Sequence, residues 1–136
     1  MPSYSTFSEQ LVRTDNTGCT SFMDLFGEQA GRLPEKIALV SEQREWSYEK
    51  LNELSNRLAF HLRTEYGVGK DRFVGIMTER SDWSIISMLA IWKAGGAFVP
   101  IDPQWPLERI RYIAEDTNLS VMLTQSAFIF NLPGID

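Results

Sequence analysis

Apolar residues recur along the chain with two spacings, one typical of helices and the other of short buried strands. The helical spacing appears at 21–33, 47–67 and 81–93, and again after Pro106. Short apolar runs lie between these segments and predict strands at 37–40, 45–46, 72–77, 98–101 and 120–124. Strands that alternate with helices predict an α/β fold, in which a mostly parallel sheet is covered by helices on both faces. The polar turn at 41–44 allows 45–46 to return as a brief second strand, and we count 37–40, 72–77, 98–101 and 120–124 as the strand series.

Hydroxyl and carboxylate side chains stand where three of the helices are expected to begin. Ser21 with Asp24 forms a plausible capping pair, Ser47 can cap the long helix, and Ser81 or Asp82 can cap the third. Such side chains accept hydrogen bonds from the free amides of the first helical turn. The pattern therefore places these three helix starts to within a residue or two.

The helix expected at 81–93 is apolar around most of its circumference, which is typical of a buried helix. Lys93 lies in its last turn, and Gly95 or Gly96 can supply the positive φ that ends it. A glycine pair beside a lysine also occurs in phosphate-binding loops, but those loops lead into a helix. Because these glycines follow a helix, at its electronegative end, we favour a structural turn.

The composition of the chain is that of an ordinary globular protein. The 136 residues carry a formal net charge of −5, and 43% of them are hydrophobic. An acidic balance argues against nucleic acid as a partner, because nucleic acid is usually met by basic surfaces. We expect no membrane association, because no run approaches the length of a spanning helix and the first ten residues do not resemble a secretory signal. Cytoplasmic localisation follows as the default expectation.

Residue types that carry chemistry are sparse. His61 and Cys19 are the only histidine and cysteine, so they cannot supply an internal disulfide or a soft-ligand metal cluster. Asp102 follows a strand at the end where parallel sheets bind ligands, but we favour a role in its proline-rich turn. Glu79 and Asp82 are interpreted as helix-capping or solvated groups. The four tryptophans stand in apolar patterns that favour core packing over ligand stacking.

The run from Lys93 to Pro103, KAGGAFVPIDP, resembles a core motif of amino-acid adenylation domains in nonribosomal peptide synthetases. These domains belong to the adenylate-forming, AMP-binding superfamily. Pro106 and Arg109 continue the likeness, and the run 46–52 resembles the family's first core motif at the usual distance upstream. The resemblance covers about residues 20–125. It implies that residues 21–136 form an incomplete N-terminal subdomain of an adenylate-forming enzyme, with 1–20 as a lead-in or linker.

The family joins an amino acid to AMP with Mg-ATP, releases pyrophosphate, and passes the acyl group to the phosphopantetheine thiol of a carrier protein. The resemblance therefore implies Mg-ATP for a parent enzyme, and the rest of the adenylation domain and a carrier protein as partners. The family's phosphate loop, its ribose-binding aspartate and its catalytic lysine find no match in these 136 residues. We expect the chain alone to be inactive and to hold no cofactor, metal or catalytic residue. The motif positions that transfer are structural: Tyr48, Leu51, Lys93, Gly95, Gly96, Pro100, Asp102, Pro103, Pro106 and Arg109.

Two alternatives remain open at the level of sequence. The chain can belong to another branch of the superfamily, such as the acyl-CoA or aryl-acid ligases. The paired glycines at 95 and 96 and the Leu123-Thr124-Gln125 run favour the peptide-synthetase branch. It can also be a stand-alone, non-catalytic module that docks on another protein through an open sheet edge. A sheet that stops after the strand at 120–124 leaves such an edge.

Overall fold

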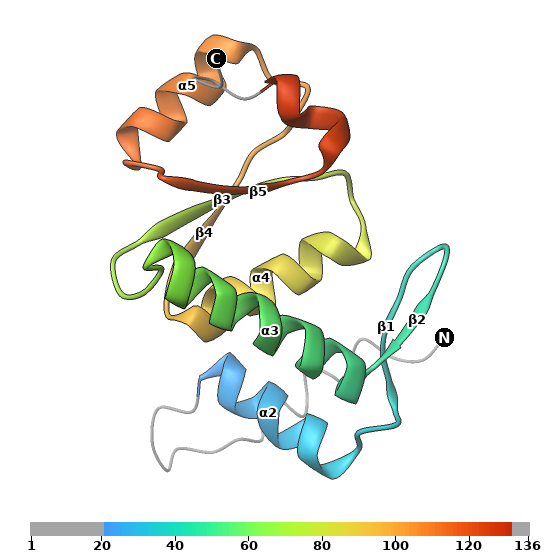
Figure 1. The fold of residues 1–136 in the computed structure, drawn as a ribbon. Helices are drawn as coiled ribbons and strands as arrows, with labels where there is room; N and C mark the ends of the chain where they lie inside the picture. Colours follow the sequence, from blue (N-terminus) through green and yellow to red (C-terminus); the bar gives the residue numbers. More distant parts are fainter. Residues whose placement is uncertain (1–20, 132–136) are drawn as a thin grey trace.

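The computed structural model describes residues 21–131 and has the alternating order that the sequence predicts (Figure 1). Its helices are α2 (Phe22–Arg32), α3 (Tyr48–Tyr66), α4 (Asp82–Ala94), α5 (Leu107–Asp116) and the short 3₁₀ helix η1 (Ser126–Asn131). Its strands are β1 (Ile37–Val40), β2 (Glu45–Ser47), β3 (Phe73–Met77), β4 (Ala97–Pro100) and β5 (Val121–Thr124).

Three strands form a parallel sheet in the order β4-β3-β5, so the earliest strand lies in the middle. Val74 on β3 stands opposite Phe98 on β4 and Val121 on β5. The predicted turn at 41–44 and the returning strand are confirmed, because β1 pairs antiparallel with β2 in a hairpin; the strand series is wrong in one respect, since this hairpin is separate from the parallel sheet. A turn of four residues joins β1 to β2, whereas parallel neighbours need a crossover of a dozen residues or more.

Helices cover both faces of the parallel sheet, as expected. In Figure 1, α3 and α4 lie below the sheet and α5 and η1 lie above it. Val74 and Ile76 point into the lower layer, where they pack with buried residues of α3 and α4. Met77 points into the upper layer and packs with Ile110 of α5. Alternate side chains of β3 therefore supply the core of each layer.

Side-chain caps form at two of the three predicted helix starts. Ser21 and Asp24 make a full capping box at α2, and hydrogen bonds from Ser21 hold the pKa of the Asp24 carboxyl below its usual value. Ser47 Oγ accepts a hydrogen bond from the Lys50 amide at the start of α3. Ser81 precedes α4, but its side chain makes no capping bond, and its hydroxyl is buried without a partner among the described residues.

The two serines at the starts of α3 and α4 give a matched pair of substitutions. We expect Ser47→Ala to lower the free energy of unfolding by about 1 kcal/mol, because it leaves a first-turn amide without its acceptor. Ser81→Ala removes no capping bond, so its expected change lies within about 0.5 kcal/mol of zero. Urea denaturation measures both. Equal losses for the two variants would contradict this assignment of caps.

Candidate functional site

The carboxyl ends of β3 and β5 are the position where this fold is expected to bind ligands. The chain leaves β3 for α4 on the lower face, and it leaves β5 for η1 on the upper face (Figure 1). Neighbouring strands whose connections leave on opposite faces, where the strand order reverses, form the topological switch point of a doubly wound sheet. The segments that border this point begin at Thr78 and Gln125.

Polar groups at this edge are bound to one another. The hydroxyls of Thr78 and Ser84 lie 2.5 Å apart, and Ser84 Oγ also donates to the Glu79 carbonyl at 2.9 Å. The Glu79 amide donates to Gln125 Oε1 at 3.0 Å, and Thr124 Oγ1 donates to the Met77 carbonyl at 2.8 Å. These bonds join the end of β3 to the start of α4 and to the segment after β5. The edge is therefore suited to fixing the geometry of its loops.

The segment after β4 is a rigid turn that leads into α5. Pro100 ends β4, and Asp102 Oδ1 accepts a hydrogen bond from the Gln104 amide at 2.8 Å across Pro103. Asp102 thus has the turn-stabilising role that its place in the sequence favours. Pro106 lies immediately before α5 with φ −53°, an angle suited to a helix start.

Arg109 lies in the first turn of α5 and stacks on the preceding loop. Its guanidinium carbon lies 4.2 Å from the centroid of the Trp105 ring. A cation over an indole face is attracted by the ring quadrupole. The contact therefore holds the proline-rich turn against the helix that follows it.

Lys93 sits in a cage of neutral oxygens between α3 and α4. Its Nζ lies 2.7 Å from each of Asn52 Oδ1, Ser55 Oγ and Asn56 Oδ1, which can accept all three of its ammonium hydrogens. The ring of Phe26 on α2 lies 5.1 Å away. The side chain thus joins three helices. The acceptors favour the charged amine, but burial opposes it and lowers the pKa of Lys93 to about 8.

The lowered pKa of Lys93 predicts a rise in stability at alkaline pH. Between the folded pKa of about 8 and the reference value of 10.5, the unfolded chain binds more protons than the folded chain. The free energy of unfolding therefore increases with pH across this window. Because the amine is half-exposed, we expect a gain on the order of 1 kcal/mol.

The measurement is the difference in unfolding free energy between the natural chain and Lys93→Arg, taken from pH 7.5 to 10.5. Arginine keeps its charge across this range, so the difference isolates the titration of Lys93. Lys70→Arg, at an exposed position, controls for the exchange itself. A difference that stays flat with pH would contradict the effect of burial on Lys93.

Gly95 and Gly96 form the turn that the sequence predicts. Gly95 has φ 87° and ends α4, and its amide donates to the carbonyls of Ile91 and Trp92. Gly96 is required for a different reason, since a Cβ there would lie 2.9 Å from Val68 Cγ1 and 3.1 Å from the Arg72 carbonyl oxygen. The pair thus stops a helix and lets β4 start close to β3. It has no phosphate-loop geometry, because it lies at the carboxyl end of α4.

The earlier motif, residues 46–52, forms the end of β2 and the first turns of α3. Leu51 is buried at 2% exposure, and Tyr48 packs its ring against Phe26 at a centroid distance of 5.8 Å. Asn52 ends this motif, and its backbone and side-chain oxygens both contact Lys93 Nζ. Asn52 of this motif and Lys93 of the 93–103 motif lie 41 residues apart in sequence, and the two motifs meet at the Lys93 amine.

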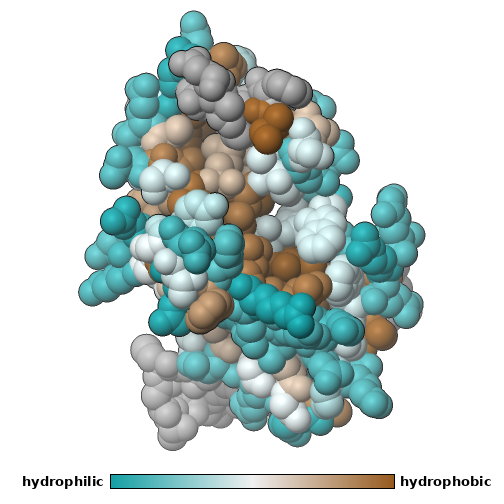
Figure 2. Space-filling view, in the orientation of Figure 1, coloured by the Kyte–Doolittle hydropathy of each residue, from teal (hydrophilic) through white to brown (hydrophobic). Residues whose placement is uncertain are grey.

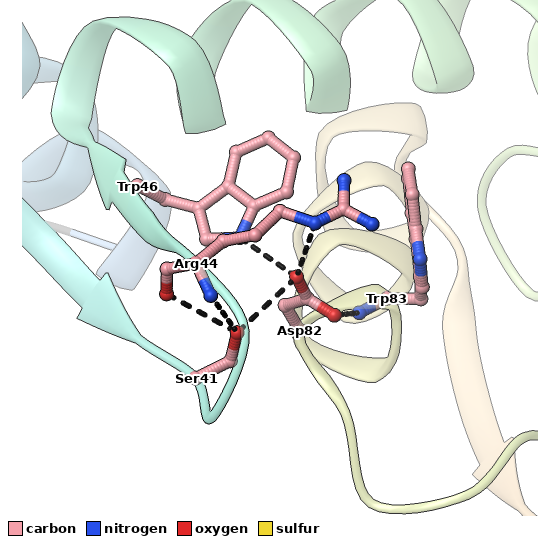
Figure 3. A network of polar contacts seen from close by, with 5 residues as sticks. All are labelled: Ser41, Arg44, Trp46, Asp82 and Trp83. Carbon is pink, nitrogen blue, oxygen red and sulfur yellow. Dashed lines mark hydrogen bonds and ion pairs between the residues drawn. The ribbon is translucent and has the colours of Figure 1, made fainter.

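A second polar network joins the β1–β2 hairpin to the start of α4 (Figure 3). Asp82 is only 8% exposed, and its Oδ2 accepts the indole hydrogen of Trp46 at 2.8 Å. The same oxygen lies 3.9 Å from Arg44 Nε. The Arg44 guanidinium lies 5.5 Å from the Trp46 ring and 5.6 Å from the Trp83 ring. A buried carboxylate, an arginine and two indoles therefore fix the hairpin to α4.

The sequence does not predict this network. Asp82 is buried, so its interpretation as a solvated group is wrong. Its Oδ1 does accept a hydrogen bond from the Trp83 amide in the first turn of α4. The core interpretation of the tryptophans holds for Trp46 but not fully for Trp83 and Trp92, which are 41% and 38% exposed. An aspartate in the first turn of a largely apolar helix is the one available signal.

The described part of the chain shows neither a cluster of metal ligands nor a membrane-spanning helix. No group of three histidine, cysteine or acidic residues within 21–131 lies close enough to hold a metal ion. No helix of this region has the length and apolar character needed to cross a bilayer. His61 is exposed on α3 beside the Tyr66 ring, and Cys19 lies outside the described residues.

Curated relatives of this chain are very large synthetases. Bacitracin synthase 3 of Bacillus licheniformis is 53% identical over 102 residues, which are 75% of this chain and 2% of that protein. Tyrocidine synthase 3 of Brevibacillus parabrevis is 49% identical over 102 residues, with the same coverage. The chain thus spans a very small share of these relatives.

Solved structures with the same fold include a nonribosomal peptide synthetase, FmoA3, in a form bound to α-methyl-L-serine-AMP. It superposes with a TM-score of 0.79 at 28% identity, over 88% of this chain and 13% of that one. The N-terminal subdomain of NpsA from Klebsiella oxytoca superposes with a TM-score of 0.73 at 29% identity, over 84% of this chain and 29% of that one. A family model described as AMP-binding enzyme matches residues 26–133, so the chain belongs to the AMP-binding enzyme family.

Proposed function

We propose that this chain is an N-terminal piece of an amino-acid-activating ligase of nonribosomal peptide synthesis. The ligase would join an amino acid to AMP from ATP, release pyrophosphate, and load the acyl group on a carrier-protein thiol. The observation that carries the proposal is the 53% identity to bacitracin synthase 3 over 102 residues, which are 75% of this chain. A match over three quarters of the chain spans several helices and strands, so the likeness extends well beyond a short motif.

The proposal assigns residues 21–136 to a partial N-terminal subdomain and residues 1–20 to a lead-in or linker. The partners are then the remainder of the adenylation domain and a carrier protein that bears phosphopantetheine. Mg-ATP would be the cofactor of the parent enzyme, and the cytoplasm its location. No nucleic acid or membrane partner is proposed. FmoA3 with its bound amino-acyl adenylate supports the chemistry, because that ligand is the intermediate class in question.

The role of this piece is to hold a sheet edge in place. Lys93 ties α4 to α3, Gly95 and Gly96 set the start of β4, and Asp102 fixes the turn after it. Lys93 and the two glycines act at the amino end of β4, and Asp102 acts beyond its carboxyl end. We therefore assign the motif residues positioning roles and expect the chain alone to catalyse no adenylation.

A second candidate is a ligase that activates an aryl acid. NpsA of Klebsiella oxytoca has been solved in complex with 3-hydroxyanthranilyl-AMSN, and this chain matches it with a TM-score of 0.76 at 28% identity. The higher identity to bacitracin and tyrocidine synthases favours an amino acid as the substrate. The two candidates differ in the acid that they activate and share the adenylate step.

The mass of the native protein gives the first test of the proposal. An antibody against residues 21–131 should detect, in a lysate of the source cells, a polypeptide many times heavier than 15.6 kDa. Its tryptic peptides should include a phosphate-loop segment downstream of this chain. A native species of 15.6 kDa would overturn the proposal and favour a stand-alone module.

A further inference from the structure

Three aromatic rings form a row that crosses from α2 over α4 to β4. The ring centroids of Phe22 and Trp92 lie 5.3 Å apart, and those of Trp92 and Phe98 lie 5.2 Å apart. Aromatic pairs at these distances attract one another beyond the effect of their buried area. Phe22 and Trp92 nevertheless remain 45% and 38% exposed. We call these three residues the aromatic row.

The aromatic row continues along one face of α4. Ile85 precedes Trp92 by two helical turns, so the two side chains lie on the same face of the helix. Ile85 is 37% exposed, and Met88 between them is only partly buried. Ala90 and Ile91 of the same helix are fully buried in the lower core. α4 therefore has one apolar face that no described element covers, and such a face is typical of an interaction site.

The chain enters the described structure beside the aromatic row. Ser21 caps α2, and Phe22 is the first residue of that helix, so the residues before Ser21 leave from one end of the row. An extended chain from Leu11 to Ser21 can span about 30 Å. The two ring-to-ring steps of the row are 5.3 and 5.2 Å. The segment 1–20 is therefore long enough to lie back over the row.

The segment 1–20 carries apolar side chains that suit such a contact. Phe7 and Leu11 stand four residues apart, which is the spacing of neighbours on one helix face, and Val12 follows them. The residues between them, Ser8, Glu9 and Gln10, are polar. The pattern thus offers an apolar side and a polar side within a short stretch.

A second apolar area of the molecule lies farther from this entry point. Figure 2 shows it as brown surface between β5 above and α3 below. β4 and β5 are the two outer strands of the described sheet, and the aromatic row ends on β4. Of the two areas, the aromatic row is therefore the one that residues before Ser21 reach first.

We propose that the segment 1–20 docks on the aromatic row, with Phe7 and Leu11 covering Trp92 and the exposed face of α4. Because the segment is joined to α2 at one end of the row, it is present there at a high effective concentration, which a separate protein or a second copy of the chain lacks. Docking would complete the lower layer on the β4 side of the sheet. The proposal goes beyond the proposed function and does not depend on it, since both surfaces lie within this chain.

Hydroxyl-radical footprinting of the natural polypeptide that contains this chain tests the proposal, because the radicals oxidise tryptophan side chains that solvent reaches. Trp92 is the probe. Trp83 is the reference, since it is 41% exposed and lies on the opposite face of the same helix. The double variant Phe7→Asp/Leu11→Asp replaces the covering side chains by carboxylates, which resist burial. We expect it to raise the oxidation rate of Trp92 relative to that of Trp83 by at least about threefold, because the indole loses its packing partners.

A second double variant controls for the added charge. Ser8→Asp/Gln10→Asp introduces the same two carboxylates at polar positions of the same segment, and we expect it to leave the ratio of the two oxidation rates as it is in the natural polypeptide.

Two results would overturn the proposal. One is an unchanged ratio in the Phe7/Leu11 variant, which would mean that Trp92 is open or is covered by another part of the polypeptide; an equal rise at both tryptophans counts in the same way. The other is a rise of the ratio that is equally large in the Ser8/Gln10 control. Neither result depends on catalysis, so the docking of this segment and the ligase activity can fail separately.

Discussion

Replacement of Asp82 by alanine is expected to destabilise the chain by about 2–4 kcal/mol. The substitution leaves the buried indole hydrogen of Trp46 without an acceptor and removes the anion beside Arg44. An unpaired buried donor loses its bonds to water without compensation. Urea denaturation, followed by tryptophan fluorescence, measures the loss of unfolding free energy.

Matched variants separate the parts of this effect. Asp82→Asn keeps an oxygen for the Trp46 indole and removes only the charge, so we expect it to lose about half as much. Asp116→Ala, at an exposed position on α5, should change stability by less than about 0.5 kcal/mol. Trp46→Phe should lower the free energy of unfolding less in an Asp82→Ala background than in the natural chain. In that background the phenylalanine removes an indole N–H that has no acceptor. A loss below about 0.5 kcal/mol for Asp82→Ala would contradict the network in Figure 3.

Gly96→Ala is expected to destabilise the chain by about 1–3 kcal/mol, through overpacking at the start of β4. The new methyl group would lie 2.9 Å from Val68 Cγ1 and 3.1 Å from the Arg72 carbonyl oxygen. Val68 is buried, and the Arg72 carbonyl is fixed by its bond from the Ala97 amide, so neither neighbour can move easily. Urea denaturation again gives the measurement.

Gly69→Ala is the matched control for Gly96→Ala. A Cβ at Gly69 would meet no atom within 4 Å. Loss of freedom in the unfolded chain should therefore stabilise this variant by about 0.4–1 kcal/mol. The two glycine replacements are thus expected to have opposite signs. A neutral or stabilising Gly96→Ala would contradict the close approach of β4 to β3.

The sequence was sufficient to place most elements, because their signals are local. The strand predicted at 37–40 is β1, and the helix predicted at 81–93 is α4 with a shift of one residue at each end. Helix-stopping glycines and capping serines act within a few residues of where they stand, so their effect can be read from spacing alone. Gly95 and Ser47 both have the roles that their neighbours in sequence predict.

Long-range pairing could not be predicted in the same way. The polar turn at 41–44 predicts the return of the chain as β2, but the apolar run of β1 does not say that the hairpin stands apart from the parallel sheet. The burial of Asp82 depends on Trp46, 36 residues earlier, which brings an indole hydrogen to it. The cage around Lys93 depends likewise on Asn52, 41 residues earlier. Such partners are set by tertiary packing, which a single sequence does not display.

The hydrogen bond between Lys93 and Asn52 explains why two motifs that are separate in the sequence belong together in the structure. One motif supplies the amine and the glycine turn, and the other ends in the asparagine that binds the amine. A change in either motif would leave unpaired groups between α3 and α4. The resemblance to adenylation domains therefore corresponds to one connected piece of structure.

The most direct test of the central claim is acid-dependent exchange of labelled pyrophosphate into ATP, measured on the purified natural polypeptide that contains this chain. We expect magnesium-dependent exchange that is stimulated by a particular amino acid and is absent without it. The 136-residue chain assayed alone should show none. Exchange stimulated by an aryl acid and by no amino acid would contradict the amino-acid assignment, and a polypeptide without acid-dependent exchange would contradict the ligase itself.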